Sequence, residues 1–584
     1  MFPFLRISKQ KPEDTATNIG NFVLEHNKNI SAFNVIKGFL NFELSTAYWL
    51  EFLKENYNNP NYGQVEIGVG QKVMVEYSSP NTNKPLHLGH VRNILLGYSV
   101  SEILKYAGYK VVKTNLINDR GIHICKSMLA WQLFGKGETP ETHKTKGDHL
   151  VGKYYVEFDK HLQAEVKKLR AKIDKYDLSG ISEAGQVKIK TLMNKIASEN
   201  DPDKLANLNG DLKTATENET SLMRQAREML QKWEAGDPEI LKLWKTMNDW
   251  VYSGFNETYK RMGVDFDTLY YESNTYLLGK DIVAEGLENG AFVKDPDGSI
   301  WIDLTNDGLD RKLVMRADGT SVYITQDLGT AQKKYEDSGM DKSIYVVGNE
   351  QDYHFKVLKL ILKKLGKPYA DGVYHLSYGM VDLPSGKMKS REGTVVDADE
   401  LMSDMYSTAK QITEELGKTE GLSVSELEIL YETIAMGALK YFLLKVDPVK
   451  RMLFNPEESI DFHGNTGPFI QYTHARLRSL LKNVNSSITV NTETELLSAE
   501  KDLLNTLSLF PSKISGAASG YNPSIVATYM FETAKAFNRL YHDVSILGET
   551  NDQLKQNRLA ICLLTANTIR KGMNLLGIHV PERM

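Results

Sequence analysis

The residues best suited to chemistry stand in a short polar loop around position 87. His87 and His90 flank Gly89, and Lys84 stands three positions before His87. Two imidazoles and an ammonium can donate hydrogen bonds to phosphate oxygens, and a glycine lets a flat ligand approach the backbone. A helix beginning here would add unpaired N–H groups and the positive end of its dipole. The pattern predicts a nucleotide-phosphate site that is not a P-loop.

The flanking sequence predicts the elements that position this loop. Residues 72–77 have strand composition, and apolar residues from 91 to 107 recur at helical spacing. Residues 110–117 then have the composition of a second strand. This order predicts a parallel crossover with the polar loop at the carboxyl end of its first strand, where open α/β sheets bind ligands. The alternative is an ordinary loop with satisfied histidines.

A second segment suited to phosphate lies 300 positions further along the chain. It is the sequence Lys387-Met388-Lys389-Ser390-Arg391, bounded by glycines. Three cations and a hydroxyl on a flexible loop could fold over a polyphosphate and offset charge during phosphoryl or nucleotidyl transfer. Alone, such a segment is more often a solvated basic turn. Only folding could bring the two segments together.

Length and composition indicate an ordinary globular protein. The 584 residues suffice for about three or four domains, and the net charge of -5 means that any nucleic acid must meet local basic patches. Cys125 and Cys562 are too few and too far apart for a disulfide framework or a zinc cluster. Because no apolar run is long enough for a membrane span or a signal peptide, we expect a cytoplasmic protein without a membrane partner.

Changes of pattern divide the chain into three parts. Residues 1–62 predict a small α+β domain, and residues 63–398 predict an α/β domain with a doubly wound parallel sheet. Residues 399–584 are almost wholly helical, with a bundle from about 451 to 584.

Within the α/β part, two features bear on the sheet and its surroundings. The strand-like runs Ile300–Leu304, Val322–Thr325 and Ser343–Val347 suit the second half of the doubly wound sheet. The stretch 136–236 is highly charged and amphipathic, which favours solvated helices inserted into the fold over a dedicated binding site.

Together, the two phosphate-suited segments resemble the paired ATP-binding sequences of class I aminoacyl-tRNA synthetases. The longer stretch 78–93, SSPNTNKPLHLGHVRN, resembles the arginyl-tRNA synthetases in particular. Residues 316–327 and 347–355 share that resemblance, and residues 464–476 and 576–584 are similar to the family's helical anticodon-binding domain. The resemblance spans nearly the whole chain.

The resemblance implies an ATP-dependent ligase with a Rossmann-like class I catalytic domain. Such an enzyme joins L-arginine to its tRNA through an arginyl-adenylate and releases pyrophosphate and AMP. No covalent enzyme nucleophile is needed, so positioning and electrostatics carry the reaction. Mg²⁺ would enter with ATP, and no dedicated metal site is expected. The family pattern further implies that adenylate formation requires bound tRNA, and we expect a monomer.

The motif match assigns the ATP contacts. His87, Gly89 and His90 hold ATP, the loop from Lys387 to Arg391 covers it, and Lys387 stabilises the phosphates in the transition state. His87, His90, Lys387 and Lys84 form the catalytic set.

The second segment departs from the common KMSKS pattern, because Ser390 stands where a second lysine would be. Lys84 is then the implied substitute for the missing charge. Lys389 and Arg391 are competing candidates, and the sequence does not decide among them.

Arginine recognition needs a carboxylate, because the planar guanidinium fork pairs best with a two-oxygen acceptor. The resemblance assigns this role to Asp327, with Tyr323 four residues before it. The matches for the remaining polar groups of the substrate are Glu76, Ser79, Asn81 and Gln351. For Glu76 the alternative is an outward-facing strand residue.

The resemblance places the tRNA anticodon on the C-terminal bundle. Candidates for base stacking and phosphate contacts are Gln471, Tyr472, His474, Arg476 and Arg478. Helical spacing alone would more often make Tyr472 a core residue. Residues 1–62 would form a second tRNA-contacting domain, and they look truncated at their start.

Two alternatives stand beside this interpretation. Another class I synthetase is disfavoured, because a cysteine enzyme usually keeps a zinc on cysteines and Asp327 would suit glutamate or glutamine poorly. The other alternative is an inactive RNA-binding relative, against which the intact His87, His90 and Lys387 argue.

Overall fold

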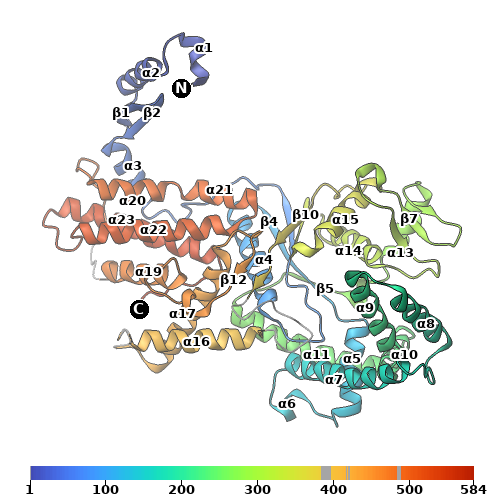
Figure 1. The fold of residues 1–584 in the computed structure, drawn as a ribbon. Helices are drawn as coiled ribbons and strands as arrows, with labels where there is room; N and C mark the ends of the chain where they lie inside the picture. Colours follow the sequence, from blue (N-terminus) through green and yellow to red (C-terminus); the bar gives the residue numbers. More distant parts are fainter. Residues whose placement is uncertain (1, 383–395, 416, 418–420, 483–487) are drawn as a thin grey trace.

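A five-stranded parallel sheet lies at the centre of the computed structural model, which describes residues 2–382, 396–415, 417, 421–482 and 488–584 (Figure 1). The strand order is β10–β9–β3–β4–β5, with β3 Lys72–Glu76, β4 Lys110–Ile117, β5 Thr268–Tyr271, β9 Lys342–Gly348 and β10 Val373–Tyr378. The chain winds from β3 outward to β5 on one side and later from β9 to β10 on the other. This confirms a doubly wound sheet, with its switch point between the carboxyl ends of β3 and β9.

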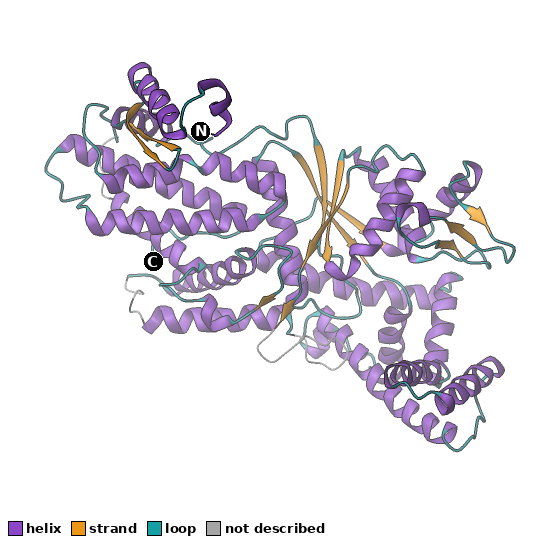
Figure 2. Ribbon diagram, turned by 45° about the horizontal axis from the view of Figure 1, so that its top comes forward, coloured by secondary structure: helices purple, strands orange, loops and turns teal. Residues whose placement is uncertain are grey.

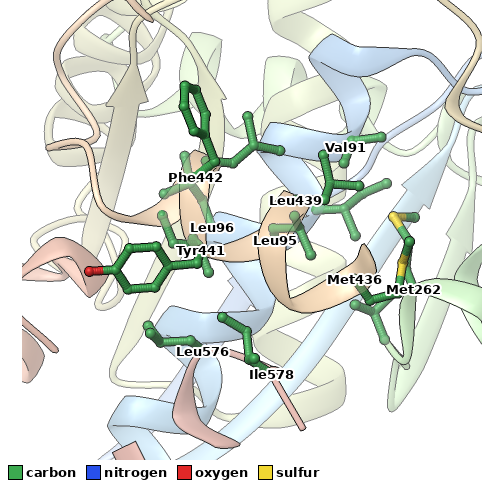
Figure 3. Close-up of a cluster of buried hydrophobic side chains, with 14 of the residues drawn as sticks. Val91, Leu95, Leu96, Met262, Met436, Leu439, Tyr441, Phe442, Leu576 and Ile578 are labelled. Carbon is green, nitrogen blue, oxygen red and sulfur yellow. The ribbon is translucent and has the colours of Figure 1, made fainter. Parts of the chain in front are cut away.

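The predicted crossover around the polar loop is confirmed. Helix α4, Leu88–Tyr106, joins β3 to β4, and these strands pair in parallel from Lys72↔Lys110 to Glu76↔Thr114. The helix is buried on nearly all sides, and its buried residues include the polar Arg92, Asn93, Ser99 and Ser101. Val91, Leu95 and Leu96 of α4 meet side chains of α17 (Val424–Leu444) and of the C-terminal segment, including Leu439 and Ile578 (Figure 3).

Of the three further runs predicted for the parallel sheet, Ser343–Val347 lies within β9, whereas the other two do not belong to that sheet. Val322–Thr325 is not a strand, because helix α14 begins at Tyr323 and the helical spacing of the apolar residues that follow outweighs the short β-branched run. Residues 300–302 do form a strand, β7, but in a separate antiparallel sheet, β6–β7–β8 (Figure 2). The Asp297-Gly298 turn before β7, with Gly298 at φ +93°, joins neighbouring antiparallel strands and so cannot serve a parallel crossover.

That small sheet belongs to a second core beside the main one. Its strands are β6 Val293–Lys294, β7 Ile300–Ile302 and β8 Lys312–Met315. The second core also includes residues of three helices. α13, Gly279–Glu288, precedes the small sheet in the chain, and α14, Tyr323–Ser338, and α15, Asp352–Lys364, follow it. α14 carries the predicted site residues Tyr323 and Asp327, and Gln351 immediately precedes α15, so this core sets where one wall of the site stands.

The charged stretch 136–236 is helical, as predicted, but two of its helices, α7 and α10, enter the main core. Its helices, with the one that follows, are α6 Pro140–His143, α7 Gly147–Ile173, α8 Glu183–Ser198, α9 Pro202–Asn218, α10 Ser221–Glu234 and α11 Pro238–Met262. Leu150, Tyr154 and Phe158 of α7 are buried in the main core. α8 and α9 pack on each other around a small core of their own, which includes Ile189 and Leu212.

The N-terminal unit stands away from the body of the molecule (Figure 1). It comprises α1 Leu5–Ser8, α2 Pro12–His26, the antiparallel hairpin of β1 Ile30–Ile36 and β2 Phe39–Leu44, and α3 Thr46–Asn56. Lys37 and Gly38 both have positive φ, which suits the tight two-residue hairpin turn. α3 contacts the C-terminal bundle at α20 and α23.

The C-terminal third is helical, on the opposite side of the sheet from α7–α10 (Figure 1). Its main helices are α16 Ala398–Glu415, α17 Val424–Leu444, α19 Gly467–Lys482, α20 Ser498–Ser508, α21 Phe510–Gly520, α22 Pro523–Asp543 and α23 Asp552–Leu575. Within the described residues, no helix combines the length and the apolar character that a membrane span needs.

Candidate active site

The loop around His87 caps the start of α4. The His87 Nδ1 accepts a hydrogen bond from the Gly89 N–H at 3.2 Å, and the His90 Nδ1 accepts one from the His87 N–H at 3.1 Å. The two rings lie close, with centroids 3.8 Å apart. Because each Nδ1 accepts, the proton of each neutral imidazole must sit on Nε2. Two Nε2–H donors are therefore left for phosphate oxygens.

Burial and Lys84 keep both imidazoles uncharged. Burial, followed by the field of Lys84, lowers the pKa of His87 to about 4. The pKa of His90 falls well below 6.5, through burial first and then through His87 and Lys84. Burial also lowers the pKa of Lys84. Lys84 is therefore the cation whose field reaches both rings, and a bound anion would be attracted by all three groups.

The chain just after the second phosphate-suited segment is bonded to the first. The residues predicted there, Lys387, Met388, Lys389, Ser390 and Arg391, fall within 383–395, outside the described residues. Immediately downstream, the Leu88 N–H donates to the Val396 carbonyl at 3.1 Å and the Ala398 N–H donates to the Leu86 carbonyl at 2.9 Å. This pairing fixes one end of the segment beside His87.

The chain before the segment is fixed to the same helix by Arg92. This guanidinium is fully buried and donates to the Gly379 carbonyl at 2.6 Å and to the Lys450 carbonyl at 2.9 Å. Short strand β11, Val381–Asp382, follows directly and pairs with β12, Met452–Leu453. Folding thus brings both flanks of the distant segment to the first turns of α4.

The predicted guanidinium partner, Asp327, lies on α14 beside a histidine. Its Oδ2 is 2.6 Å from Nε2 of His354 on α15, and this hydrogen bond raises the pKa of His354. The Asp327 side chain is 38% exposed, so the carboxylate remains open to a ligand. Tyr323, one turn earlier, is 82% exposed, so its ring lies in solvent. Gln351 is also exposed, just past the carboxyl end of β9.

Glu76 is buried, so the alternative of an outward-facing strand residue is wrong. It is 5% exposed at the end of β3 and forms an ion pair with Lys334 of α14, which is 1% exposed. The Lys334 ammonium also lies 4.8 Å from the centroid of the Tyr345 ring. Ser79 is half-buried and Asn81 exposed, on the loop that leaves β3 at the switch point. The predicted arginine ligands are thus gathered from the ends of β3 and β9 and from α14.

Three polar residues at the neighbouring strand ends escaped the sequence reasoning. Glu272 follows β5, and burial raises its pKa to about 7, aided by Asp119 and Asp327 and opposed by Arg120. The Arg120 guanidinium lies 3.7 Å from the Tyr276 ring centroid. Asp119 and Arg120 could have been found from their position in the sequence, because both follow the predicted strand 110–117 and so lie at the carboxyl end of the sheet.

A cavity of about 910 Å³ opens between the His87 loop and the inserted helices. Its cationic and imidazole side chains come from several elements, namely Lys84, His87, His123, Lys126, His149, Lys153, Lys160 and Lys213, with Asp159, Glu217, Asp397 and Glu400 among them. Because α7 and α9 line this cavity, the stretch 136–236 borders the site, which its solvated pattern did not indicate.

An ionic network joins α7 to the chain at 397–399. The His149 Nε2 lies 3.3 Å from Asp397 Oδ2 and 3.2 Å from Asp399 Oδ2, and these carboxylates raise the pKa of His149 to about 10. Asp148, His149 and Asp399 are close enough to share a metal ion, but the Lys146 ammonium lies 2.5 Å from Asp399 and 3.6 Å from Asp148. The Lys146 ammonium therefore already pairs with both Asp148 and Asp399.

Two of the predicted tRNA contacts are buried, which contradicts that part of the prediction. Gln471 and His474 are both 0% exposed on α19. The Gln471 Nε2 donates to the His579 carbonyl at 2.8 Å, and the His474 Nδ1 is 2.9 Å from the Pro581 carbonyl. The spacing of three residues puts Gln471 and His474 on the same face of α19, which the C-terminal segment around His579 and Pro581 covers. They bind the C-terminal segment rather than an external partner.

The other three candidates on α19 are half-buried. The Arg476 guanidinium stacks on Tyr472, 4.8 Å from its ring centroid, and donates to Asn538 Oδ1 at 2.5 Å. The Arg478 Nε lies 2.5 Å from Glu582 Oε2. An arginine on an aromatic ring at this surface suits stacked bases and phosphates.

Fold and site together define a class of protein, the class I aminoacyl-tRNA synthetases. A family model described as "tRNA synthetases class I (R), catalytic domain" matches residues 54–200 and 186–455. A second model, "DALR anticodon binding domain", matches residues 470–584.

Full-length relatives give the particular family. The arginine–tRNA ligase of Flavobacterium psychrophilum is 52% identical over 596 residues, covering 100% of this chain and 93% of the relative. That of Bacteroides fragilis is 52% identical over 590 residues with the same coverage. The chain belongs to the arginine–tRNA ligases, also called arginyl-tRNA synthetases.

Solved structures agree on the fold. The Thermus thermophilus arginyl-tRNA synthetase matches with a TM-score of 0.75 at 22% identity, over 100% of this chain and 93% of that one. The Plasmodium falciparum enzyme matches with a TM-score of 0.71 at 17% identity, over 97% of this chain and 89% of that one.

Proposed function

We propose that this chain ligates L-arginine to its tRNA in an ATP-dependent reaction through an arginyl-adenylate. The observation that carries the proposal is the full-length relationship to arginine–tRNA ligases, together with a His87 loop at the start of α4 that is bonded to the flank of the distant basic segment. The arginine carboxylate attacks the α-phosphate and pyrophosphate leaves. A hydroxyl of the terminal tRNA ribose then attacks the activated carbonyl, and AMP leaves.

ATP is held at the first turn of α4. His87 and His90 donate from Nε2 to phosphate oxygens, and Gly89 lets the nucleotide approach the backbone. With each neutral imidazole protonated on Nε2, both rings can donate to phosphate oxygens near neutral pH although neither is charged. The segment from Lys387 to Arg391 covers the phosphates, and Lys387 offsets the charge that develops on the leaving pyrophosphate.

Lys84 supplies the charge that Ser390 lacks. Lys84 lines the same cavity as His87, and its charge lowers the pKa of both histidines, which supports this role. Lys389 and Arg391 are the competing candidates. Mg²⁺ enters with the ATP phosphates, since the cavity beside His87 is lined by five lysines, which repel a bare metal ion.

Arginine lies across the switch point, between the loop after β3 and α14. Its guanidinium pairs with the carboxylate of Asp327, whose partial exposure supports this contact. Ser79, Asn81 and Gln351 hold the remaining polar groups, and Tyr323 covers the ligand after moving from solvent. Glu76 adds negative charge to the arginine site, beside its ion-pair partner Lys334.

The tRNA spans from the bundle to this site. Tyr472, Arg476 and Arg478 contact the anticodon region, and residues 1–62 contact another part of the tRNA. We further propose that the chain works as a monomer in the cytoplasm.

Charging assays test the proposal. The unaltered chain is supplied with ATP and each amino acid in turn, with and without tRNA, and aminoacyl-tRNA and pyrophosphate exchange are measured. We expect charging with arginine alone, and exchange only when tRNA is present. Charging with another amino acid contradicts the specificity, and folded protein that binds tRNA without charging it points to the RNA-binding alternative.

A further inference from the structure

Two consecutive serines after β3 have left-handed backbone conformations. Ser78 has φ +77° and Ser79 has φ +44°. Such values are uncommon for residues with a side chain, and they persist only where the surroundings determine the conformation. This turn redirects the chain as it leaves β3, and it therefore sets where Ser79 and Asn81 stand at the switch point.

Four side chains from three parts of the fold hold the turn. The Asn93 Oδ1 of α4 accepts from the Ser78 N–H at 2.6 Å, and the Asn115 Oδ1 of β4 accepts from the Ser79 N–H at 3.0 Å. The Asn118 Nδ2, just past β4, donates to the Ser79 carbonyl at 3.2 Å. The Tyr259 hydroxyl of α11 lies 2.6 Å from the Ser78 Oγ.

Three of these side chains are inside the protein, where water cannot replace their hydrogen bonds. Asn93 is 6% exposed, Asn115 is 0% exposed and Tyr259 is 5% exposed. The Tyr259 ring is fixed by an edge contact with Phe266, with centroids 5.0 Å apart. A rigid, desolvated hydroxyl is a strong constraint on the serine that it meets.

We propose that Tyr259 is a positioning residue for arginine, acting through the strained turn at Ser78 and Ser79. This rests on the proposed function, in which Ser79 and Asn81 contact arginine. Without the Tyr259 hydroxyl, Ser78 loses the bond that offsets its backbone strain, and the turn relaxes. Ser79 and Asn81 then leave the positions from which they meet the substrate.

The ATP side of the same loop has separate supports. Leu86 and Leu88 are bonded through their backbone to Ala398 and Val396, and His87 and His90 cap α4. Relaxation at Ser78 therefore affects arginine binding more than ATP binding. A general loosening of the fold would affect both.

The test is a pair of substitutions read by steady-state charging kinetics. Tyr259→Phe removes one hydroxyl and keeps the ring. The hydroxyl has a short bond with Ser78 and a long one of 3.4 Å from the Asn115 Nδ2. We expect the arginine KM to rise about fivefold, the ratio that corresponds to the short, neutral hydrogen bond. The ATP KM and kcat should change less than about twofold by the same scale. Adding Ser78→Gly should return the arginine KM toward the parental value, because glycine adopts positive φ without strain.

Tyr106→Phe is the matched control. Its hydroxyl donates to the Tyr62 carbonyl at 2.8 Å near the far end of α4, so the same chemical loss should leave the arginine KM unchanged. Amide exchange at Ser78 and Ser79 provides a second readout, and it should quicken in Tyr259→Phe.

The outcomes separate this inference from the proposed function. A parent that fails to charge arginine overturns the function. A parent that charges arginine, with variants whose arginine and ATP KM values shift equally or with no rescue by glycine, overturns the positioning role alone.

Discussion

Replacing Arg92 by methionine should loosen the chain that leads into the basic segment. Arg92 is fully buried, and its guanidinium bonds five backbone carbonyls, two of them at 2.6 and 2.9 Å. Burial lowers its pKa to about 10, so it stays protonated near neutral pH. Methionine fills similar space but leaves these acceptors unpaired. At about 1.5–3 kcal/mol for each of the two short bonds, less the desolvation that the cation no longer suffers, the local loss is about 3 kcal/mol.

Hydrogen exchange of backbone amides near β11 measures this local loss of stability. The Gly379 N–H donates to the Pro448 carbonyl at 2.9 Å, and the Met452 N–H donates to the Met380 carbonyl at 3.1 Å. A loss of about 3 kcal/mol should quicken exchange at these amides about 100-fold. Because the segment with Lys387 starts just beyond Asp382, the ATP KM should rise as well.

Arg261→Met is the control for Arg92→Met. Arg261 is a partly exposed arginine that pairs with Glu432 at 2.9 Å and bonds Ser403 at 3.0 Å and the Asp399 carbonyl at 3.4 Å, and none of these partners is a carbonyl that Arg92 holds. It should leave exchange at Gly379 and Met452 unchanged. If Arg92→Met also leaves exchange and the ATP KM at parental values, Arg92 does not anchor this segment and the reasoning is refuted.

Three further predictions concern single side chains. Lys84→Met should slow adenylate formation about 100- to 1000-fold, because a positive charge near the phosphates is lost. For the same reason the pKa of His87 should rise in a histidine NMR titration. A near-parental rate would indicate that Lys389 or Arg391 supplies the charge instead. Asp327→Asn should raise the arginine KM about 10- to 100-fold with a smaller change in kcat, and should lower the pKa of His354; an unchanged KM would remove Asp327 from the arginine site. The pKa of His149 is raised from 6.5 to about 10, so its ion pairs stabilise the fold fully below pH 6.5 and lose that effect as the pH rises toward 10. The melting temperature should therefore fall more steeply between pH 7 and 10 in the parent than in His149→Gln, and equal slopes would refute the pairing.

The local order of elements around the ATP site could be predicted from the sequence. Strand alternation over residues 72–77 and helical spacing from 91 to 107 are short-range patterns, and α4 with its neighbouring strands follows them. The same reasoning failed at Val322–Thr325, where four residues were too few to distinguish a strand from the first turn of α14. It also put residues 300–302 in the wrong sheet, because pairing partners are set by turns and packing elsewhere in the chain.

The sequence by itself thus predicted the residue types proposed for the site and the elements that carry them: His87, His90 and Lys84 at a helix start and, through the family resemblance, Asp327 for a guanidinium. Only the tertiary structure decided which groups meet. The pairing of Glu76 with Lys334, 258 positions away, and the burial of Gln471 and His474 under the last residues of the chain depend on long-range packing. The physical reason is that periodicity reports neighbours a few residues apart, whereas contacts across hundreds of residues exist only once the core has closed around them.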